Sequence, residues 1–294
     1  MTERRHPVGV IGTGLMGTAC AKRLLAAGLE VLGHDADASK LKPLEALGAR
    51  AARSLVETAG KCDIIVLAVF NTDQVEDVIE SLLAARPAGA APLIVICVST
   101  CDPDRIATLA ARLPAARVRF VEAPISGTSD QTARGEGLGL IGGEPAAADE
   151  ARAVLDAICP RRHHVGAAGN GGRAKLAINL ILGVNRAALA EGLVFAERMG
   201  LAPEKFLEVA RESAAYSQVM DIKGGKMVKG DFTPHGLVTQ SLKDFSLMAE
   251  QARRTGQRLP LAETYTGLMQ GCLAHGEGEL DNSAVIREIR RRTG

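Results

Sequence analysis

One segment of the chain places an ammonium group and a primary amide on the same side of a predicted helix. The segment reads GNGGRAKLAINLI, and its Lys175 and Asn179 are four residues apart, so they share a helix face. A lysine whose pKa is lowered by a partly desolvated site can take up a proton and return it. A neighbouring amide can hold that ammonium without neutralising it. On its own the pair decides nothing, because a lone helical lysine is more often a surface residue whose charged end reaches water.

A glycine-rich stretch near the N-terminus predicts a dinucleotide-binding turn. VGVIGTGLMG has the spacing G-x-G-x-x-G at Gly12, Gly14 and Gly17, between an apolar run and a helix-like segment. In that context Gly12 permits the tight turn, Gly14 lets pyrophosphate approach the backbone and Gly17 permits close helix–strand packing. The N–H groups at the helix start, at Leu15, Met16 and Gly17, would face the phosphates. A purely structural turn between a strand and a helix is the alternative.

An aspartate at the end of the next predicted strand favours NAD over NADP. Asp35 lies in GHDADAS, where a carboxylate can accept hydrogen bonds from both ribose hydroxyls and would repel a 2′-phosphate. The next residues are Ala36 and Asp37, so no arginine follows to pair with that phosphate. We therefore predict NAD as the cofactor. The alternative is an ordinary aspartate in a surface loop.

The elements that must position these residues alternate between strands and helices in the first part of the chain. Short, continuous apolar runs are typical of strands buried on both faces, and they occur at residues 8–11, 30–33, 64–69, 93–98, 118–121 and 138–141. Helix-like segments connect them at residues 18–27, 38–47, 74–85 and 104–112. This alternation predicts parallel βαβ units. Ligands bind at the carboxyl ends of such strands, where Asn71, Ser99 and Thr100 lie, although Asn71 could equally cap a helix.

The pattern changes near residue 166, after which helical periods replace the strand-like runs. These periods cover residues 172–199, 203–215, 237–254, 261–274 and 283–291. We predict the α/β fold class, with an NAD-binding Rossmann domain over residues 1–165 that contains a doubly wound parallel sheet. An all-helical domain would follow over residues 166–294, and the long helix 172–199 would connect the two domains. Lys175 would then lie in the first turn of that helix, where the positive end of the dipole favours loss of its proton.

Composition narrows the class of protein and its partners. Hydrophobic residues make up 47% and aromatic residues 3%, so the core must be built mainly from Ala, Leu, Val and Ile. The net charge of +1 gives no reason to expect a nucleic-acid or acidic-membrane partner. The basic ending REIRRRTG is interpreted as a solvated helix end. We also expect no segment long enough to span a bilayer and no signal peptide.

The six cysteines show neither C-x-x-C spacing nor a compact disulfide framework. Cys97 and Cys101 flank a strand end, but no second cluster of ligands supports zinc there. We therefore expect reduced thiols, no metal site and a cytoplasmic protein.

Four motifs together resemble those of the β-hydroxyacid dehydrogenases, the group that contains 3-hydroxyisobutyrate dehydrogenase and tartronate semialdehyde reductase. They are GVIGTGLMG from Gly9, EAPISG from Glu122, GNGGRAKLAIN from Gly169 and LKDFSLMAEQA from Leu242, and they extend over nearly the whole chain. Their order and spacing carry the resemblance more than any single motif does. The resemblance implies a Rossmann domain, a long interdomain helix, a helical domain and an active site in the cleft. It also implies a homo-oligomer, and we expect a homodimer or homotetramer.

The resemblance implies roles for the chemical groups named above. Lys175 would be the catalytic acid and base, and Asn179 its supporting amide. Ser126 and Gly127, with Thr128 beside them, would bind the substrate's carboxylate. A hydroxyl and an exposable backbone after a strand are suited to an anion, although an ordinary turn would look similar.

Further contacts are implied in the same way. Thr100 would lie near the nicotinamide, and Phe232 would line the substrate pocket. Lys243 would border both the substrate and the cofactor, and Asp244 could pair with it. As a plain pair of neighbours on an exposed helix, the last two would mean little.

The chain departs from the family's pattern at two places. Thr128, Gln131 and Thr132 stand where small residues are common, and His235 and Gly236 stand where many relatives have a Gly–Phe pair. Added hydroxyls, an added amide and a lost aromatic ring favour a polar substrate. We therefore expect hydride transfer between the nicotinamide and a small polar 3-hydroxy acid or its semialdehyde, rather than 3-hydroxyisobutyrate. His235 can equally be an ordinary loop residue.

Two alternative functions share the predicted architecture. An imine reductase is the first, but that group typically lacks the lysine found at position 175. A catalytically silent NAD-binding interaction module is the second. The presence of Lys175, Asn179 and Ser126 together argues against it.

Overall fold

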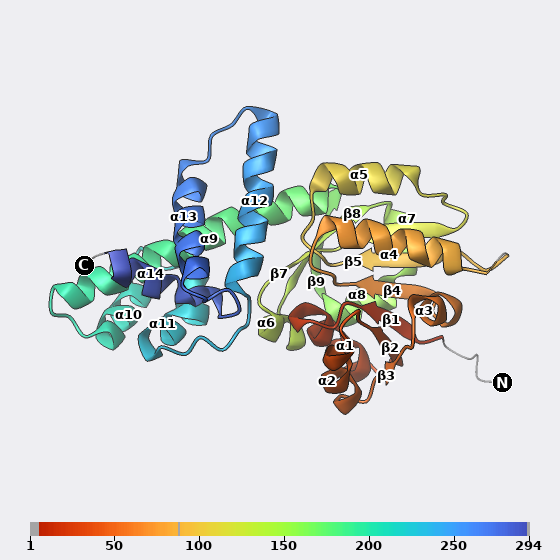
Figure 1. Ribbon diagram of the computed structural model, residues 1–294, viewed down its shortest axis with the longest axis horizontal. Helices are drawn as coiled ribbons and strands as arrows, with labels where there is room; N and C mark the ends of the chain where they lie inside the picture. Colours follow the sequence, from red (N-terminus) through yellow and green to blue (C-terminus); the bar gives the residue numbers. More distant parts are fainter. Residues whose placement is uncertain (1–5, 88, 293–294) are drawn as a thin grey trace. The chain divides into compact units, whose positions relative to one another are not determined.

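The computed structural model describes residues 6–87 and 89–292. Two compact units make up the chain, the first ending at Lys175 and the second beginning at Leu176. This division falls inside the long helix α9 (Asn170–Arg198), later in the chain than the predicted boundary after residue 165. Unit 1 carries the sheet and unit 2 is helical (Figure 1).

Unit 1 is built on one sheet whose first six strands run parallel. The order begins β3 (Arg50–Ala51), β2 (Val31–His34), β1 (Val8–Ile11). It continues on the other side of β1 with β4 (Ile64–Leu67), β5 (Leu93–Cys97) and β6 (Val118–Glu122). The chain therefore reverses its direction of winding between β1 and β4, and doubly wound sheets bind their ligands at such a point.

The far end of the sheet is not parallel. β8 (Leu138–Gly143) runs antiparallel to β6, β7 (Ile125–Ser126) runs antiparallel to β8, and β9 (Arg161–Gly166) runs parallel to β8. Three strands, β3, β7 and β9, escaped prediction. The first two have only two residues each, and β9 reads RRHHVG with mostly exposed side chains, so it lacks the apolar run that marks a buried strand.

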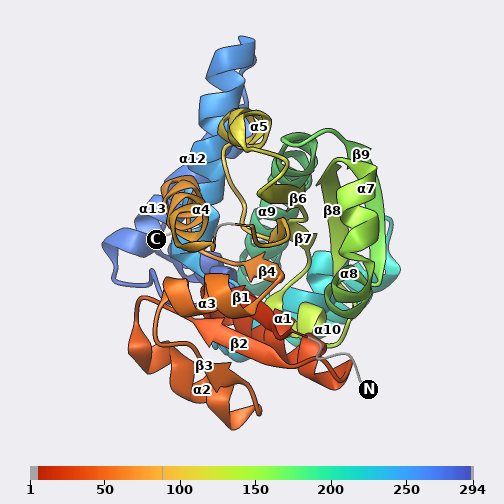
Figure 2. The same ribbon diagram turned by 90° about the vertical axis from the view of Figure 1, so that its right-hand side faces the viewer.

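Helices cover both faces of this sheet (Figure 2). On one face lie α1 (Leu15–Ala26), α7 (Pro145–Glu150) and α8 (Arg152–Ile158). The other face is covered by α3 (Leu55–Lys61), α4 (Thr72–Ala85) and α5 (Pro103–Arg112). Strand β5 shows why its sequence is apolar throughout: Ile94 and Ile96 pack with the first group of helices, and Leu93 and Val95 with the second.

Unit 2 is an assembly of helices around a core that contains Leu193, Met227, Phe245 and Met269. Its elements after α9 are α10 (Pro203–Glu212), a π-helical turn (Met220–Gly224), α11 (Gly225–Lys229), α12 (Val238–Thr255), α13 (Pro260–Ala274), a 3₁₀ turn (Asn282–Ala284) and α14 (Val285–Arg292). All the predicted helices of this part are present. The π-helical turn and α11 were not predicted, because two adjacent glycines interrupt the apolar period there.

Helix α9 is apolar on more than the side that packs into unit 2. By length and composition alone it could cross a bilayer, so the expectation that no segment reaches that length is wrong. Leu189 and Leu193 are buried in the core of unit 2, yet only 28% of the most apolar window of the helix is buried. Ile181 and Phe195 are exposed. The helix therefore serves as a core element and also presents an uncovered apolar surface.

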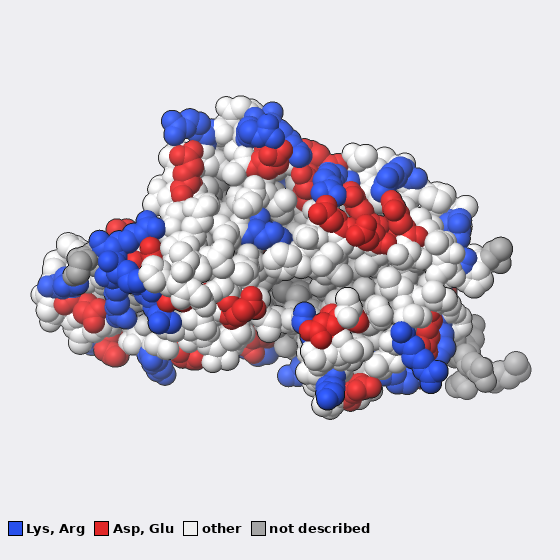
Figure 3. Space-filling view, viewed as in Figure 1, with Lys and Arg blue, Asp and Glu red and all other residues white. Residues whose placement is uncertain are grey.

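Acidic and basic side chains are mixed over the face that Figure 3 draws. The basic residues of α14 form ion pairs within unit 2, where Arg291 contacts the buried Glu277 at 2.9 Å and Arg292 contacts the buried Glu288 at 2.8 Å. The basic ending of the chain is thus partly neutralised by carboxylates that it covers.

Candidate active site

The glycine-rich turn follows β1 at the point where the strand order reverses. Gly12 has a φ of +86°, and a Cβ there would lie 2.5 Å from the Ala68 carbonyl oxygen, so only glycine fits. A Cβ on Gly17 would lie 1.8 Å from the Gly12 carbonyl oxygen. At Gly14, in contrast, a Cβ would meet no described atom within 4 Å. Packing within the protein therefore does not require a glycine at position 14. A pyrophosphate that approaches the backbone closely would require one, because a side chain would occupy its space.

Helix α1 begins directly after this turn with its N–H groups available. It starts at Leu15 with Gly14 as its N-cap, and its first turn contains no acidic residue. Those N–H groups, together with the positive end of the helix dipole, form a site suited to an anion. The residues present thus fit the pyrophosphate of a dinucleotide.

Asp35 follows β2 and is held by the same turn. Its Oδ2 accepts hydrogen bonds from the Thr13 backbone N–H at 2.6 Å and the Thr13 hydroxyl at 3.2 Å, and its Oδ1 accepts one from the Asp37 N–H at 2.9 Å. The carboxylate is therefore fixed in orientation and only partly buried. Thr13 was not singled out from the sequence, although it lies inside the glycine motif.

The polar residues after β4 and β5 have structural duties as well. Asn71 caps α4 by accepting a hydrogen bond from the Gln74 N–H at 2.9 Å, which was the alternative to cofactor binding considered for it. Ser99 donates its hydroxyl proton to the Val69 carbonyl oxygen at 2.7 Å, and Thr100 is buried beside it. This bond joins the ends of two parallel strands on the ligand-binding edge of the sheet.

The segment after β6 offers a hydroxyl and an unusual backbone. Ser126 ends β7, opposite Leu138 of β8, and is partly buried. Gly127 has a φ of +149°, a conformation that favours glycine. These features agree in kind with a segment that holds an anion.

The polar residues that follow cap a short helix. In α6 (Ser129–Ala133), the Thr128 hydroxyl accepts from the Gln131 N–H at 3.1 Å, and the Gln131 side chain accepts from the Thr128 N–H at 2.9 Å. This reciprocal capping box explains the presence of both Thr128 and Gln131 by their role in starting α6, without a contact to substrate. Thr132 is fully buried. The argument that these three side chains favour a polar substrate is thereby weakened.

Lys175 is buried, with an exposed fraction of 7%. Its Nζ donates a hydrogen bond to the Ile125 carbonyl oxygen at 2.7 Å. It is thus not the surface lysine that a lone helical lysine usually is. Because α9 begins at Asn170, Lys175 lies in the second turn, and the expected help from the dipole at the first turn does not apply in that form.

Glu122 is a buried carboxylate to which the sequence motif gave no role. It ends β6 with an exposed fraction of 2% and accepts hydrogen bonds from the N–H groups of Gly169 (2.8 Å), Gly171 (3.0 Å) and Gly172 (2.8 Å). Burial raises the pKa of this carboxyl group, and the three N–H bonds oppose the shift. The sequence feature that could have indicated Glu122 is an acidic residue at the end of a buried apolar strand.

In unit 2, Asp244 connects two residues that the sequence predicted separately. Its Oδ2 accepts from the Asn179 amide nitrogen at 2.9 Å, and its Oδ1 lies 3.0 Å from the Lys243 Nζ. A carboxylate can only accept, so Asn179 must turn its NH₂ group toward Asp244 and its oxygen elsewhere. Asp244 therefore orients both Asn179 and Lys243.

Phe232 and His235 belong to a loop that a buried ion pair holds. Asp281 accepts a hydrogen bond from the His235 N–H at 2.9 Å, and its own N–H donates to the Phe232 carbonyl oxygen at 2.9 Å. The Lys223 Nζ lies 2.8 Å from both carboxylate oxygens of Asp281. The Arg287 guanidinium lies over the Phe232 ring, 5.7 Å from its centre.

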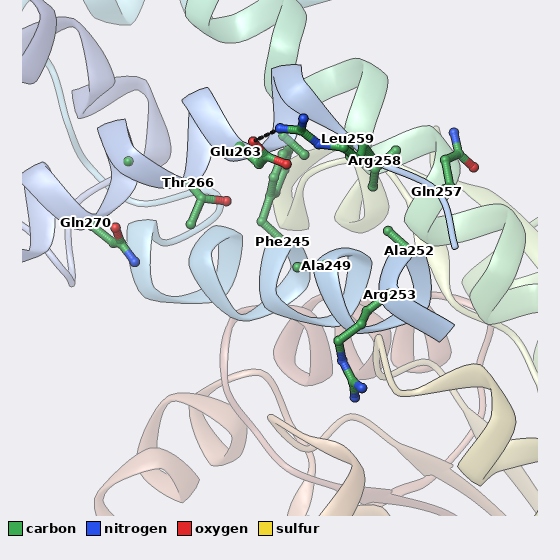
Figure 4. Close-up of a pocket in the computed structure, with 12 residues that line it drawn as sticks. Phe245, Ala249, Ala252, Arg253, Gln257, Arg258, Leu259, Glu263, Thr266 and Gln270 are labelled. Carbon is green, nitrogen blue, oxygen red and sulfur yellow. Dashed lines mark hydrogen bonds and ion pairs between the residues drawn. The ribbon is translucent and has the colours of Figure 1, made fainter. Parts of the chain in front are cut away.

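A pocket of about 450 Å³ lies between α12 and α13 of unit 2 (Figure 4). Its lining is mainly apolar and includes Phe245, Ala249 and Leu259, while Arg258 and Glu263 pair at its edge at 3.4 Å. None of the residues predicted for catalysis, substrate or cofactor lines it. The pocket is therefore separate from the chemistry described above.

Family models match almost the whole chain in two parts. Residues 7–166 match the NAD-binding domain of 6-phosphogluconate dehydrogenase. Residues 169–289 match the NAD-binding domain of NADP-dependent 3-hydroxyisobutyrate dehydrogenase.

Individual relatives match over the same extent. The chain is 30% identical to 2-(hydroxymethyl)glutarate dehydrogenase of Eubacterium barkeri, covering 99% of this chain and 97% of the relative. It is 31% identical to L-threonate dehydrogenase of Cupriavidus necator, covering 95% of each. A crystal structure of 3-hydroxyisobutyrate dehydrogenase from Salmonella typhimurium has a TM-score of 0.86 at 31% identity, covering 96% of this chain and 99% of that one. The chain belongs to the β-hydroxyacid dehydrogenase family and is an oxidoreductase with nicotinamide-dinucleotide-binding domains that acts on CH–OH groups.

Proposed function

We propose that the protein transfers a hydride between NAD and a small polar 3-hydroxy acid or its semialdehyde, with Lys175 as the general acid and base. The observation that carries the proposal is the buried Lys175 ammonium, held 2.7 Å from the carbonyl oxygen of Ile125. The next residue is Ser126, which the family resemblance assigns to the substrate's carboxylate. In this proposal the proton-transfer group is therefore bonded to the residue directly before the proposed anion-binding residue.

Each polar group has a step to perform. A bound nicotinamide supplies the position that accepts or returns the hydride. Lys175 takes the proton from the substrate hydroxyl during oxidation and returns it to the carbonyl oxygen during reduction. The Ser126 hydroxyl and the backbone at Gly127 bind the carboxylate. The family resemblance gives Lys243 the role of adding positive charge toward the same acid group. Asn179 turns its NH₂ group to Asp244, which leaves its amide oxygen as the acceptor that can hold the Lys175 ammonium.

The preference for NAD rests on Asp35. Three hydrogen bonds fix its carboxylate at the end of β2, where a ribose 2′-hydroxyl would be accepted and a 2′-phosphate repelled. The family model for the second part of the chain is described as NADP-dependent. Both cofactors therefore belong in every assay.

The substrate class rests on the relatives more than on the α6 side chains. Two similar proteins are named for 2-(hydroxymethyl)glutarate and L-threonate, which are polar hydroxy acids. A panel of these two acids, 3-hydroxyisobutyrate and the corresponding semialdehydes, followed by absorbance of the reduced cofactor, tests the proposal. We expect the highest kcat/KM for a hydroxylated or dicarboxylic acid. A kcat/KM for 3-hydroxyisobutyrate far above the others would overturn this choice.

We also propose a homodimer or homotetramer in the cytoplasm. Ile181 and Phe195 expose apolar surface on α9, and a second copy of the chain would remove it from water. Light scattering should give a multiple of the chain mass, reduced by Phe195→Glu, and a monomeric unmodified protein would contradict the idea.

The six free, buried cysteines support the proposed cytoplasmic location, because thiols stay reduced in a reducing compartment. Recovery of the protein in the membrane or extracellular fraction of cells would argue against that location.

A further inference from the structure

The start of α9 is fixed from a distant part of the chain. Three N–H groups at this helix start donate to the Glu122 carboxylate, which lies 47 residues before Gly169 in the sequence. The first N–H groups of any helix have no partner within the helix. The first turn of α9 contains no acidic residue of its own, so Glu122 supplies the missing acceptors.

The glycines of GNGG follow from this arrangement. A Cβ on Gly172 would lie 2.9 Å from Glu122 Oε1, and a Cβ on Gly171 would lie 2.9 Å from Oε2 and 2.7 Å from the Leu140 carbonyl oxygen. Gly142 of β8 faces the same carboxylate, because a Cβ there would lie 2.7 Å from Oε2. Glycines on two elements thus make room for one buried carboxylate.

The same short segment holds the helix at two points. Glu122 binds the first turn of α9, and three residues later the Ile125 carbonyl oxygen accepts the hydrogen bond from Lys175 in the second turn. Ser126 comes next in the segment. The position of the Lys175 ammonium relative to Ser126 therefore depends on how the Glu122 carboxylate seats the helix.

We propose that Glu122 is a positioning residue for proton transfer, which holds the start of α9 so that Lys175 faces the segment 125–127. This inference rests on the proposed role of Lys175. It also distinguishes two helix starts in unit 1. The first turn of α1 has no acid and can receive a phosphate, whereas a carboxylate of the protein already occupies the start of α9.

The charge of Glu122 adds a second effect that can be measured. A carboxylate at the helix start offsets the positive end of the dipole and favours the protonated form of a nearby lysine. Replacing it by an amide should therefore make Lys175 lose its proton at lower pH. A residue that only stabilised the fold would not change the pH profile.

The test compares Glu122→Gln with the unmodified enzyme in the oxidation direction. We expect kcat to fall roughly 10- to 100-fold, as a displacement of about 1 Å in a catalytic group can produce. Binding of the reduced cofactor, followed by its own fluorescence because the chain has no Trp, should change less than about 2-fold, since the site at α1 is untouched. The acidic limb of the kcat/KM profile should move to lower pH. An unchanged kcat and an unchanged limb in folded Glu122→Gln would overturn the proposal.

Glu122→Asp decides the question if the glutamine variant does not fold. It keeps the charge but is one methylene shorter, so the helix start cannot be seated in the same way. We expect a lower kcat with an unmoved acidic limb, and an unchanged kcat would contradict the positioning role. Glu288→Gln is the matched control, because Glu288 is a buried carboxylate of α14 that is 5% exposed. It should lower thermal stability and leave the pH profile as it is.

A double variant separates this proposal from the one on which it rests. If Glu122 acts through Lys175, adding Glu122→Gln to Lys175→Ala should reduce kcat by less than about 2-fold further. A further 10-fold loss would show that Glu122 acts by another route. If Lys175→Ala itself kept full turnover, the proposed function would fail, whatever Glu122 does.

Discussion

The Lys175 ammonium donates a hydrogen bond to the Ile125 carbonyl oxygen at 2.7 Å. This bond ties the second turn of α9 to the segment that follows β6, where Ser126 supplies a hydroxyl and Gly127 has a backbone conformation that favours glycine. The bond orients the amine, and the carbonyl oxygen that accepts it carries no full charge. A lysine held in this way can exchange a proton with a substrate hydroxyl.

Asp35→Asn should shift the cofactor preference. Removing the carboxylate loses an acceptor for the ribose hydroxyls and the repulsion of a 2′-phosphate. We expect kcat/KM for NAD to fall about 10-fold or more and that for NADP to rise, since one hydrogen bond to a charged group contributes about 1.5–3 kcal/mol. Asp37→Asn is the control, because the exposed Asp37 carboxylate caps the following 3₁₀ turn and contacts Asp35 only through its backbone N–H, which the substitution keeps. An unaltered ratio of the two kcat/KM values in Asp35→Asn would count against the assigned role.

Exchanging the amide and the acid at Asn179 and Asp244 should change the pH profile. Asn179→Asp alone places two carboxylates against each other, so we expect lower stability. Adding Asp244→Asn restores an acid–amide pair and should recover that stability. The carboxylate would now lie on the same helix face as Lys175, four residues away, and should move the acidic limb of kcat/KM to higher pH. A double variant with an unmoved limb would contradict the supporting role of Asn179.

The buried pair of Lys223 and Asp281 should control stability rather than catalysis. Burial lowers the pKa of Lys223 to about 8, although the Asp281 charge opposes the shift. Asp281→Asn leaves the ammonium buried without its carboxylate, which should lower the free energy of unfolding by about 3–5 kcal/mol at neutral pH. The loss should shrink as pH rises to about 8, because Lys223 then gives up its proton in the unmodified protein as well.

Denaturant unfolding of both proteins from about pH 3 to about pH 9 measures this difference. Burial raises the pKa of Asp281, but the Lys223 charge and hydrogen bonds from Lys223, His235 and Ser283 outweigh it and lower the pKa below 3.8. The ionised Asp281 carboxylate therefore contributes to the free energy of unfolding above about pH 3.8, and this contribution is lost as pH falls further. A stability difference that stays constant with pH would mean that the pair is not ionised.

The sheet could be predicted wherever strands are buried on both faces. β5 is an unbroken apolar run because its alternate residues pack on opposite layers of helices. β9 could not be found in this way, since it is an edge strand of mostly exposed Arg and His residues. The antiparallel direction of β8 was also missed, because an apolar run carries no information on direction.

The site residues were predictable where one short motif contains the whole interaction. Gly12 and Gly17 meet each other within the same turn, so the motif alone explains them. The contacts of Lys175 and Glu122 join segments about 50 residues apart, and one acceptor is a backbone carbonyl that every residue possesses. No local pattern could reveal those contacts.

The central claim is that Lys175 exchanges the proton, and Lys175→Ala tests it most directly. Steady-state turnover should be measured with NAD and the best substrate of the acid panel, beside binding of the reduced cofactor and the far-ultraviolet circular dichroism of the variant. We predict that kcat falls about 10²- to 10⁴-fold, as expected for the loss of a general acid and base, while the cofactor still binds and the fold is retained. A folded variant that binds cofactor and turns over at the unmodified rate would contradict the account.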